Sequence, residues 1–360
     1  MPIDTGLAQL SNAFLVVALL AYSLAVLAFA ADLAFGRRRA ASAGAQAPAE
    51  AAEQPELAGV AAAAGAGGAG PSAGLPAGGP PDADGQAGHR SIAGSFKILR
   101  GAAADYRPGT WVRAALAATF VGLLAHMAGL VARGLAVHRL PWGDMYEFVV
   151  ALTCVAVVFF LGLMIKYRAY YLGMFVMGAV VVALGLAQTV IYTAAGPLVP
   201  ALQSYWLSIH VTAITLAVGT YFVAAVLGIV YLAAEWHAGR VAAGRAATAG
   251  MMSRLPAPEV LDRLSYRTVM FAFPIWTFGI IAGAIWADQA WGRYWGWDPT
   301  ETWAFITWVV YACFLHARST AGWRGRKAAV IQLIGFCCLL FNMVGVSLFI
   351  TGLHSYAGLN

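Results

Sequence analysis

The residues most suited to chemistry in this chain lie between Trp291 and Glu301, where three tryptophans and a tyrosine share a short segment between two apolar runs. Two glycines let the backbone turn beneath these rings, and the aromatic surface suits a flat apolar ligand. Asp298, Pro299 and Glu301 match the N-cap, first-turn and capping-box positions of a helix. We therefore expect an aromatic loop that ends by starting a helix.

Two histidines are the candidate metal ligands beside this loop. His210 lies about two turns into a predicted helix, and His354 follows the last predicted helix. Haem iron accepts an imidazole on each face, while its ring rests on apolar and aromatic surface. Zinc is disfavoured, because this side of the chain offers no cysteine and its carboxylates, among them Asp144 and Glu147, match helix caps. The spacing leaves two interpretations: an axial pair for haem, or an aromatic belt with histidines in local hydrogen bonds.

The elements that position these residues are membrane helices. Hydrophobic residues make up 61% of the chain and charged residues 11%, with a mean hydropathy of +0.73, which is far from a soluble globular composition. At ~20 apolar residues per span, the sequence predicts an all-α polytopic membrane helical bundle of about eight transmembrane helices. They are expected at 11–35, 110–133, 147–166, 169–192, 206–235, 267–287, 302–318 and 328–351.

Basic residues are concentrated in every second connection of this bundle. The even-numbered connections contain only Arg133, Arg139 and Arg293. Because basic loops stay in the cytoplasm, both termini, the aromatic loop and the segment with His354 are expected on the extracytoplasmic face. The net charge of +6 follows from this bias and requires no nucleic acid.

Three regions are expected along the chain. Residues 1–35 form an N-terminal transmembrane helix, and 108–360 form the main transmembrane domain with the aromatic loop at 288–303. Between them, 36–107 is a cytoplasmic linker rich in Ala, Gly and Pro, whose composition predicts disorder, with a short basic amphipathic helix at 91–107.

Several function classes are excluded by missing motifs. The four cysteines fall inside predicted spans without a Cys-x-x-Cys pair, so the chain is neither a thiol oxidoreductase nor itself a c-type cytochrome. It has no Walker loop and no dinucleotide fingerprint, so a nucleotide-driven motor is not expected.

His316 is expected apart from the other histidines. A helix rises about 1.5 Å per residue, so His316 lies ~27 Å from the cap at Asp298, in the inner half of the membrane. The same arithmetic raises His126 by ~22 Å from Trp111, into the outer half. The two are therefore not expected to bind one ion or macrocycle together.

The aromatic segment resembles the WWD signature of haem-handling proteins. With its neighbours it is similar to the CcsA/ResC family of System II cytochrome c maturation, whose actinobacterial members are often called CcsB. The resemblance covers roughly 108–360, and the segments that carry it are Pro141–Glu147, Ser204–Val211, Trp291–Trp303, Ile306–Arg318, Gly322–Ala329 and Gly352–Tyr356.

The resemblance implies roles for single residues. His210 and His354 match the extracytoplasmic axial ligands of haem awaiting attachment. His316 matches a transmembrane histidine that binds haem on its way out, with a companion from a partner protein. The residues that match the WWD core around the outer haem are Trp291, Trp295, Trp297 and Asp298. The family assigns no role to His126.

The resemblance also implies a function. A multi-pass protein of the bacterial cytoplasmic membrane would export haem b with a ResB/CcsB-like partner and present it for thioether attachment to apocytochrome c. A thioredoxin-like reductant would keep the acceptor Cys-x-x-Cys-His thiols reduced. The chain would then be a subunit of a cytochrome c synthase, or haem lyase. The alternatives are a System I type haem chaperone, a proton-coupled secondary transporter and a structural scaffold.

Overall fold

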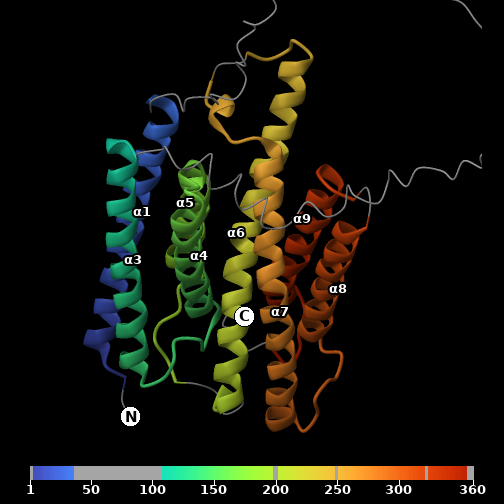
Figure 1. The fold of residues 1–360 in the computed structure, drawn as a ribbon. Helices are drawn as coiled ribbons and strands as arrows, with labels where there is room; N and C mark the ends of the chain where they lie inside the picture. Colours follow the sequence, from blue (N-terminus) through green and yellow to red (C-terminus); the bar gives the residue numbers. More distant parts are fainter. Residues whose placement is uncertain (1–2, 36–107, 198–201, 248–249, 321–322, 355–360) are drawn as a thin grey trace, which may run out of the picture. The chain divides into compact units, whose positions relative to one another are not determined.

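The computed structural model describes residues 3–35, 108–197, 202–247, 250–320 and 323–354, and the described residues contain no strand. The expected linker at 36–107, with its amphipathic helix, lies outside them. The helices are α1 (Thr5–Phe35), α3 (Thr110–Val137), α4 (Met145–Tyr167), η1 (Tyr170–Leu172), α5 (Gly173–Thr189), α6 (Tyr205–Ala242), η3 (Met252–Arg254), α7 (Pro258–Trp291), α8 (Pro299–Ser319), α9 (Arg326–Leu340), η4 (Phe341–Val346) and α10 (Ser347–Phe349) (Figure 1).

The membrane-crossing elements agree with the expected class. Seven helices of the described chain are long and apolar enough to cross a membrane, namely α1, α3, α4, α5 with η1, α6, α7, and α9 with η4. The remaining expected span, 302–318, corresponds to α8, which has 21 residues and carries Glu301, His316 and Arg318. The chain is thus a multi-pass membrane protein, and the prediction of an all-α helical bundle is confirmed.

Two helices are longer than expected. The predicted spans at 206–235 and 267–287 were too short, because α6 and α7 contain 38 and 34 residues. Pro258 occupies the first turn of α7, where the N–H that proline lacks would have no partner within the helix. At the other end α7 continues to Trp291, and Gly292 ends it in the left-handed conformation. The aromatic loop proper is therefore only residues 292–298.

Helix pairing brings the functional segments to one end of the bundle. The packed pairs include α1 with α3, α6 with α7, α4 with α6, and α8 with α9. The α3–α4 connection, the start of α6 and the α7–α8 connection lie at the same end, and the α6–α7 connection lies at the other (Figure 1). The last helical stretch includes η4, a π-helical turn. Beyond α10 the chain leaves the helix and continues to His354.

His126 belongs to the interior of this bundle. Its Nε2 donates to the carbonyl of Val150 on α4 over 3.0 Å, and Tyr22 on α1 donates its hydroxyl to Nδ1 over 3.3 Å. The side chain is completely buried. Both ring nitrogens have protein partners, so His126 joins three helices and is not available as a metal ligand.

Asp144 and Glu147 play different parts at the α3–α4 connection. Asp144 accepts from the backbone N–H of Glu147 and caps α4, as predicted. Glu147 is 1% exposed and accepts hydrogen bonds from Arg133 and Arg139 over 2.9 and 2.7 Å. This buried, paired cluster fixes the connection against α4, because separating its charges would leave one of them uncompensated.

Candidate functional site

His210 is held by the close approach of α6 to α7. Its Nδ1 lies 2.8 Å from the carbonyl oxygen of Gly279. A carbonyl only accepts, so His210 carries its proton on Nδ1 and its lone pair on Nε2. A Cβ atom at Gly283 would lie 2.6 Å from the imidazole. The pair Gly279 and Gly283 therefore makes room for the ring, as small residues four apart do between membrane helices.

Trp286 is the common neighbour of the groups around His210. Its indole stacks on the His210 ring at 5.9 Å and 15°, and it is 2% exposed. The same indole meets Trp291 edge-on at 4.8 Å and His354 at 5.7 Å. Both candidate iron ligands thus touch one buried aromatic ring.

His354 reaches this ring from the chain beyond α10. Its Nδ1 lies 2.8 Å from Oδ2 of Asp298, and its ring is 5.0 Å from that of Trp291. Asp298 also accepts from the backbone N–H of Leu353 over 2.7 Å through Oδ1. With the carboxylate as acceptor, His354 places its proton on Nδ1 and its lone pair on Nε2.

Asp298 also caps α8, and the predicted capping box with Glu301 is confirmed. Partial burial raises the pKa of Asp298. The hydrogen bonds from His354 and from the backbone N–H groups of Leu353 and Thr300 outweigh this, so the net pKa lies below its usual value. Asp298 is therefore ionised at neutral pH. Its negative charge raises the basicity of the lone pair on Nε2 of His354.

Glu301 holds the aromatic loop from its other side. Its Oε2 accepts from the backbone N–H groups of Gly296 and Asp298 over 2.8 and 3.1 Å. Between them, Trp297 adopts a left-handed backbone with φ of 57°, which is unusual for a bulky residue. Its indole is 65% exposed and contacts Trp295 and Phe305 outside the histidine cavity. The loop thus divides its tryptophans between an inner and an outer face.

The cavity between these groups has a volume of about 90 Å³. It is lined by His210, His354, Trp286, Trp291 and Trp295, among others. Pockets that enclose drug-sized ligands usually measure ~300 Å³ or more, so a porphyrin enters only if the loop and the His354 segment move apart. The two imidazoles could serve as iron ligands, because each has its Nδ1 held by an acceptor and its lone pair on Nε2.

Two expected site residues lie outside this cavity. Trp297 faces away from it, as described above. His316 is exposed in the last turn of α8, at the opposite end of that helix from Asp298. The separation along the helix axis is ~27 Å, so His316 does not share one ligand with His210 and His354.

Three residues that shape the site were not predicted from the sequence. Gly279 and Gly283 form a G-x-x-x-G pattern inside an apolar run, a signal that was available for close helix packing. Trp286 had no comparable signal, since an aromatic residue near the end of a span is ordinary. Its importance follows only from its contacts across helices.

Comparison with known proteins places this arrangement in a family. The model of the cytochrome C assembly protein family matches residues 142–354, which include every site residue named above. The chain is 38% identical over 240 residues to the cytochrome c biogenesis protein CcsA of Guillardia theta, covering 61% of this chain and 77% of that protein. With CcsA of Gloeobacter violaceus it shares 33% over 293 residues, covering 68% and 86%.

Among solved structures, the cytochrome c haem lyase CcmF aligns with a TM-score of 0.45 and 20% identity, over 69% of this chain and 44% of that one. The family model covers more than half of the chain, and the two CcsA relatives are matched over most of their length. The chain therefore belongs to the cytochrome c assembly protein family and to the CcsA family of cytochrome c biogenesis proteins.

Proposed function

We propose that this chain, with a ResB/CcsB-like membrane partner, exports haem b and presents it to apocytochrome c at His210 and His354. The observation that carries the proposal is the pair of imidazoles that both contact the Trp286 ring, each with its Nδ1 hydrogen-bonded to an acceptor. Metal-bound histidines almost always have this outer-shell hydrogen bond, which fixes the tautomer and the ring orientation.

The chain's own residues hold and orient the haem substrate. Nε2 of His210 and Nε2 of His354 bind the iron from its two faces. Trp291 and Trp295 supply the aromatic surface for the porphyrin, and Asp298 keeps His354 turned toward the iron. Imidazole ligation with restricted solvent favours the ferrous state required for attachment.

The attachment step belongs to haem and its acceptor. Each reduced thiol of the Cys-x-x-Cys-His motif adds across a vinyl group, so a C–S bond and a C–H bond form and no atom leaves. A thioredoxin-like protein keeps those thiols reduced. The acceptor histidine then replaces one imidazole on the iron. His354 is the ligand we expect to leave, because a short non-helical segment carries it, whereas His210 is fixed within α6. The contribution of this chain is positioning.

Haem reaches the site at His210 and His354 from the cytoplasmic side of the membrane. On that side, His316 binds the haem together with a ligand from the partner. The distribution of arginine and lysine supports an extracytoplasmic aromatic loop, with both termini on the same side. We place the chain in the bacterial cytoplasmic membrane, as its resemblance to the CcsA/ResC family implies.

Purification of the chain with its partner tests the proposal. The reduced visible spectrum and haem content of the parent complex would be compared with those of His210→Ala, His354→Ala and His316→Ala. His138→Asn serves as the control, because His138 is exposed and lies outside the histidine cavity. We expect near-stoichiometric six-coordinate haem in the parent and the control.

The variants should separate the two haem positions. Loss of six-coordination in His210→Ala and His354→Ala, with recovery on addition of imidazole, is the expected result for the outer pair. Loss of outer haem in His316→Ala would support delivery from the inner side. A parent complex without haem, or outer-histidine variants with unchanged spectra, would overturn the proposal.

A further inference from the structure

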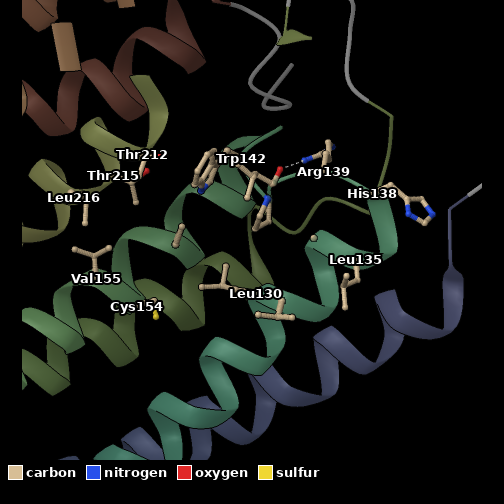
Figure 2. Close-up of a pocket in the computed structure, with 15 residues that line it drawn as sticks. Leu130, Leu135, His138, Arg139, Trp142, Cys154, Val155, Thr212, Thr215 and Leu216 are labelled. Carbon is tan, nitrogen blue, oxygen red and sulfur yellow. Dashed lines mark hydrogen bonds between the residues drawn. The ribbon is translucent and has the colours of Figure 1, made fainter. Parts of the chain in front are cut away.

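Three arginines of the described chain lie at the end of the bundle that carries the histidine cavity, and two of them are paired within the protein. Arg133 and Arg139 bind the carboxylate of Glu147 over 2.9 and 2.7 Å. Figure 2 shows Arg139 in a further hydrogen bond, to the carbonyl of Leu140. The third, Arg293, is exposed in the aromatic loop, and no hydrogen bond, ion pair or ring contact joins it to another described residue. Its charge is therefore available to a ligand.

Arg293 lies at the rim of the histidine cavity. Trp291 and Tyr294, which lie on either side of it in the sequence, both line that cavity. Its guanidinium folds back over Gly296, where a Cβ atom would overlap it. Gly296 donates its N–H to Glu301, which belongs to the cavity wall. The positive charge is thus held against the loop segment that closes one side of the cavity.

Two carboxylates that hold the aromatic loop, Asp298 and Glu301, already have other partners. Asp298 accepts from the His354 imidazole and caps α8. Glu301 accepts from two backbone N–H groups of the loop. Neither carboxylate forms an ion pair with Arg293 within the described residues. The loop therefore supplies no counter-charge for this guanidinium, which remains free for an acidic group from outside the chain.

Two hydroxyl groups add to this set of donors. Tyr294 and Thr300 line the cavity, and neither hydroxyl has a hydrogen-bond partner among the described residues. A guanidinium presents parallel N–H groups that match the two oxygens of a carboxylate, and a hydroxyl donates one more hydrogen bond. The ligand class that these three groups fit is therefore a carboxylate attached to a flat ring that occupies the aromatic part of the cavity.

We propose that Arg293, together with the Tyr294 and Thr300 hydroxyls, binds the propionate carboxylates of the haem whose iron lies between His210 and His354. This inference rests on the proposed function. Two axial imidazoles fix the axis through the iron but leave the porphyrin able to turn about it. A charge-assisted contact at the carboxylate edge removes that rotation, so the vinyl groups, which sit on the other two pyrrole rings, face one constant direction. Arg293 thus sets which edge of the haem the acceptor thiols meet.

Haemin and its dimethyl ester, which lacks the two carboxylate charges, test the inference. Each would be titrated into the purified complex with the partner, and the six-coordinate absorbance would give the affinity. All proteins carry His316→Ala, so that bound haem is read at the outer pair. Arg293→Gln and Arg293→Lys are compared with Arg113→Gln, the control, because Arg113 is exposed on α3 and does not line the cavity. Circular dichroism checks that each variant is folded.

We expect the His316→Ala parent and Arg113→Gln to bind haemin about tenfold more tightly than the ester, the size of one charge-assisted hydrogen bond. Arg293→Gln should bind both compounds alike and retain its six-coordinate spectrum. Arg293→Lys should recover part of the preference, because it keeps the charge but not the planar fork. An unchanged preference in Arg293→Gln, or loss of six-coordination with both compounds, would overturn the inference. A parent without six-coordinate haem would instead overturn the proposed function and this inference with it.

Discussion

At the scale of single residues, the carboxylate of Asp298 is the group on which His354 depends most directly. Asp298→Asn retains an oxygen for the helix cap but replaces the charged acceptor of the His354 hydrogen bond. Loss of such an outer-shell partner typically costs ~10–100-fold in metal affinity. We expect a loss of that order in haem affinity, measured by titration of the purified complex.

The control for this change is Asp288→Asn, near the end of α7. Asp288 contributes its backbone carbonyl to the cap of that helix, which the substitution leaves in place. If both variants bind haem as tightly as the parent, Asp298 serves only the helix start.

Trp286 is the second residue whose effect should appear in the iron itself. Trp286→Leu keeps an apolar side chain but removes the ring that stacks on His210 and touches His354. We expect haem to be retained in part, with altered electron paramagnetic resonance signals of the ferric form, because the imidazole planes are no longer fixed. Trp236→Leu, at an exposed site on α6, should leave those signals unchanged. Identical spectra for all three proteins would mean that Trp286 only fills space.

At the scale of helices, the contact between α6 and α7 sets the position of His210. Gly283→Ala places a methyl group 2.6 Å from the imidazole, so the ring or the helix must shift. We expect loss of the six-coordinate spectrum with little change in helix content. Gly178→Ala on α5 is the control, because a Cβ there meets no atom within 4 Å, and alanine stabilises a helix by ~0.5–1 kcal/mol relative to glycine. Six-coordinate haem in Gly283→Ala would contradict this prediction, because it would show that α7 can shift without displacing His210.

This scale also separates what the sequence could predict from what it could not. The caps at Asp144 and Asp298 were predictable because each depends on residues within one helical turn. The aromatic loop, His210 and His354 were singled out as candidates from residue types alone. The place of Trp286 and the outward turn of Trp297 depend on contacts between helices far apart in the chain, which no local pattern records. The extra length of α6 and α7 could not be predicted either. Polar residues near a proline are typical of a loop, and only packing between the helices keeps these segments helical.

At the scale of the whole molecule, α1 is expected to stabilise the helical bundle, although it lies outside the segment that the family model matches. The family model begins at residue 142, yet α1 packs against α3 and α5. Ser11 donates to the carbonyl of Gly129, and Tyr22 fits beside Gly122 while bonding His126. These contacts predict that removal of residues 1–35 lowers the thermal unfolding midpoint of the purified protein and reduces its yield.

A deletion of similar size gives the comparison. Removing residues 45–75 from the expected linker should leave the unfolding midpoint within experimental error of the parent. If the two deletions behave alike, α1 is a detachable anchor and its buried contacts do not stabilise the rest of the bundle.

The π-helical turn between Phe341 and Val346 affects the register of the chain that leads from α9 to His354. A π-helical turn holds one extra residue in a locally widened turn, so the chain after it stays nearly in phase with the helix before it. Deleting one residue from the regular part of α9, where no widened turn absorbs the change, would turn the following chain by about 100° and draw it back by about 1.5 Å. His354 would then leave Asp298 although no residue of the site had changed. The number of residues between Phe341, which packs on Trp303, and His354 therefore matters to the proposed haem site as much as the two histidines do.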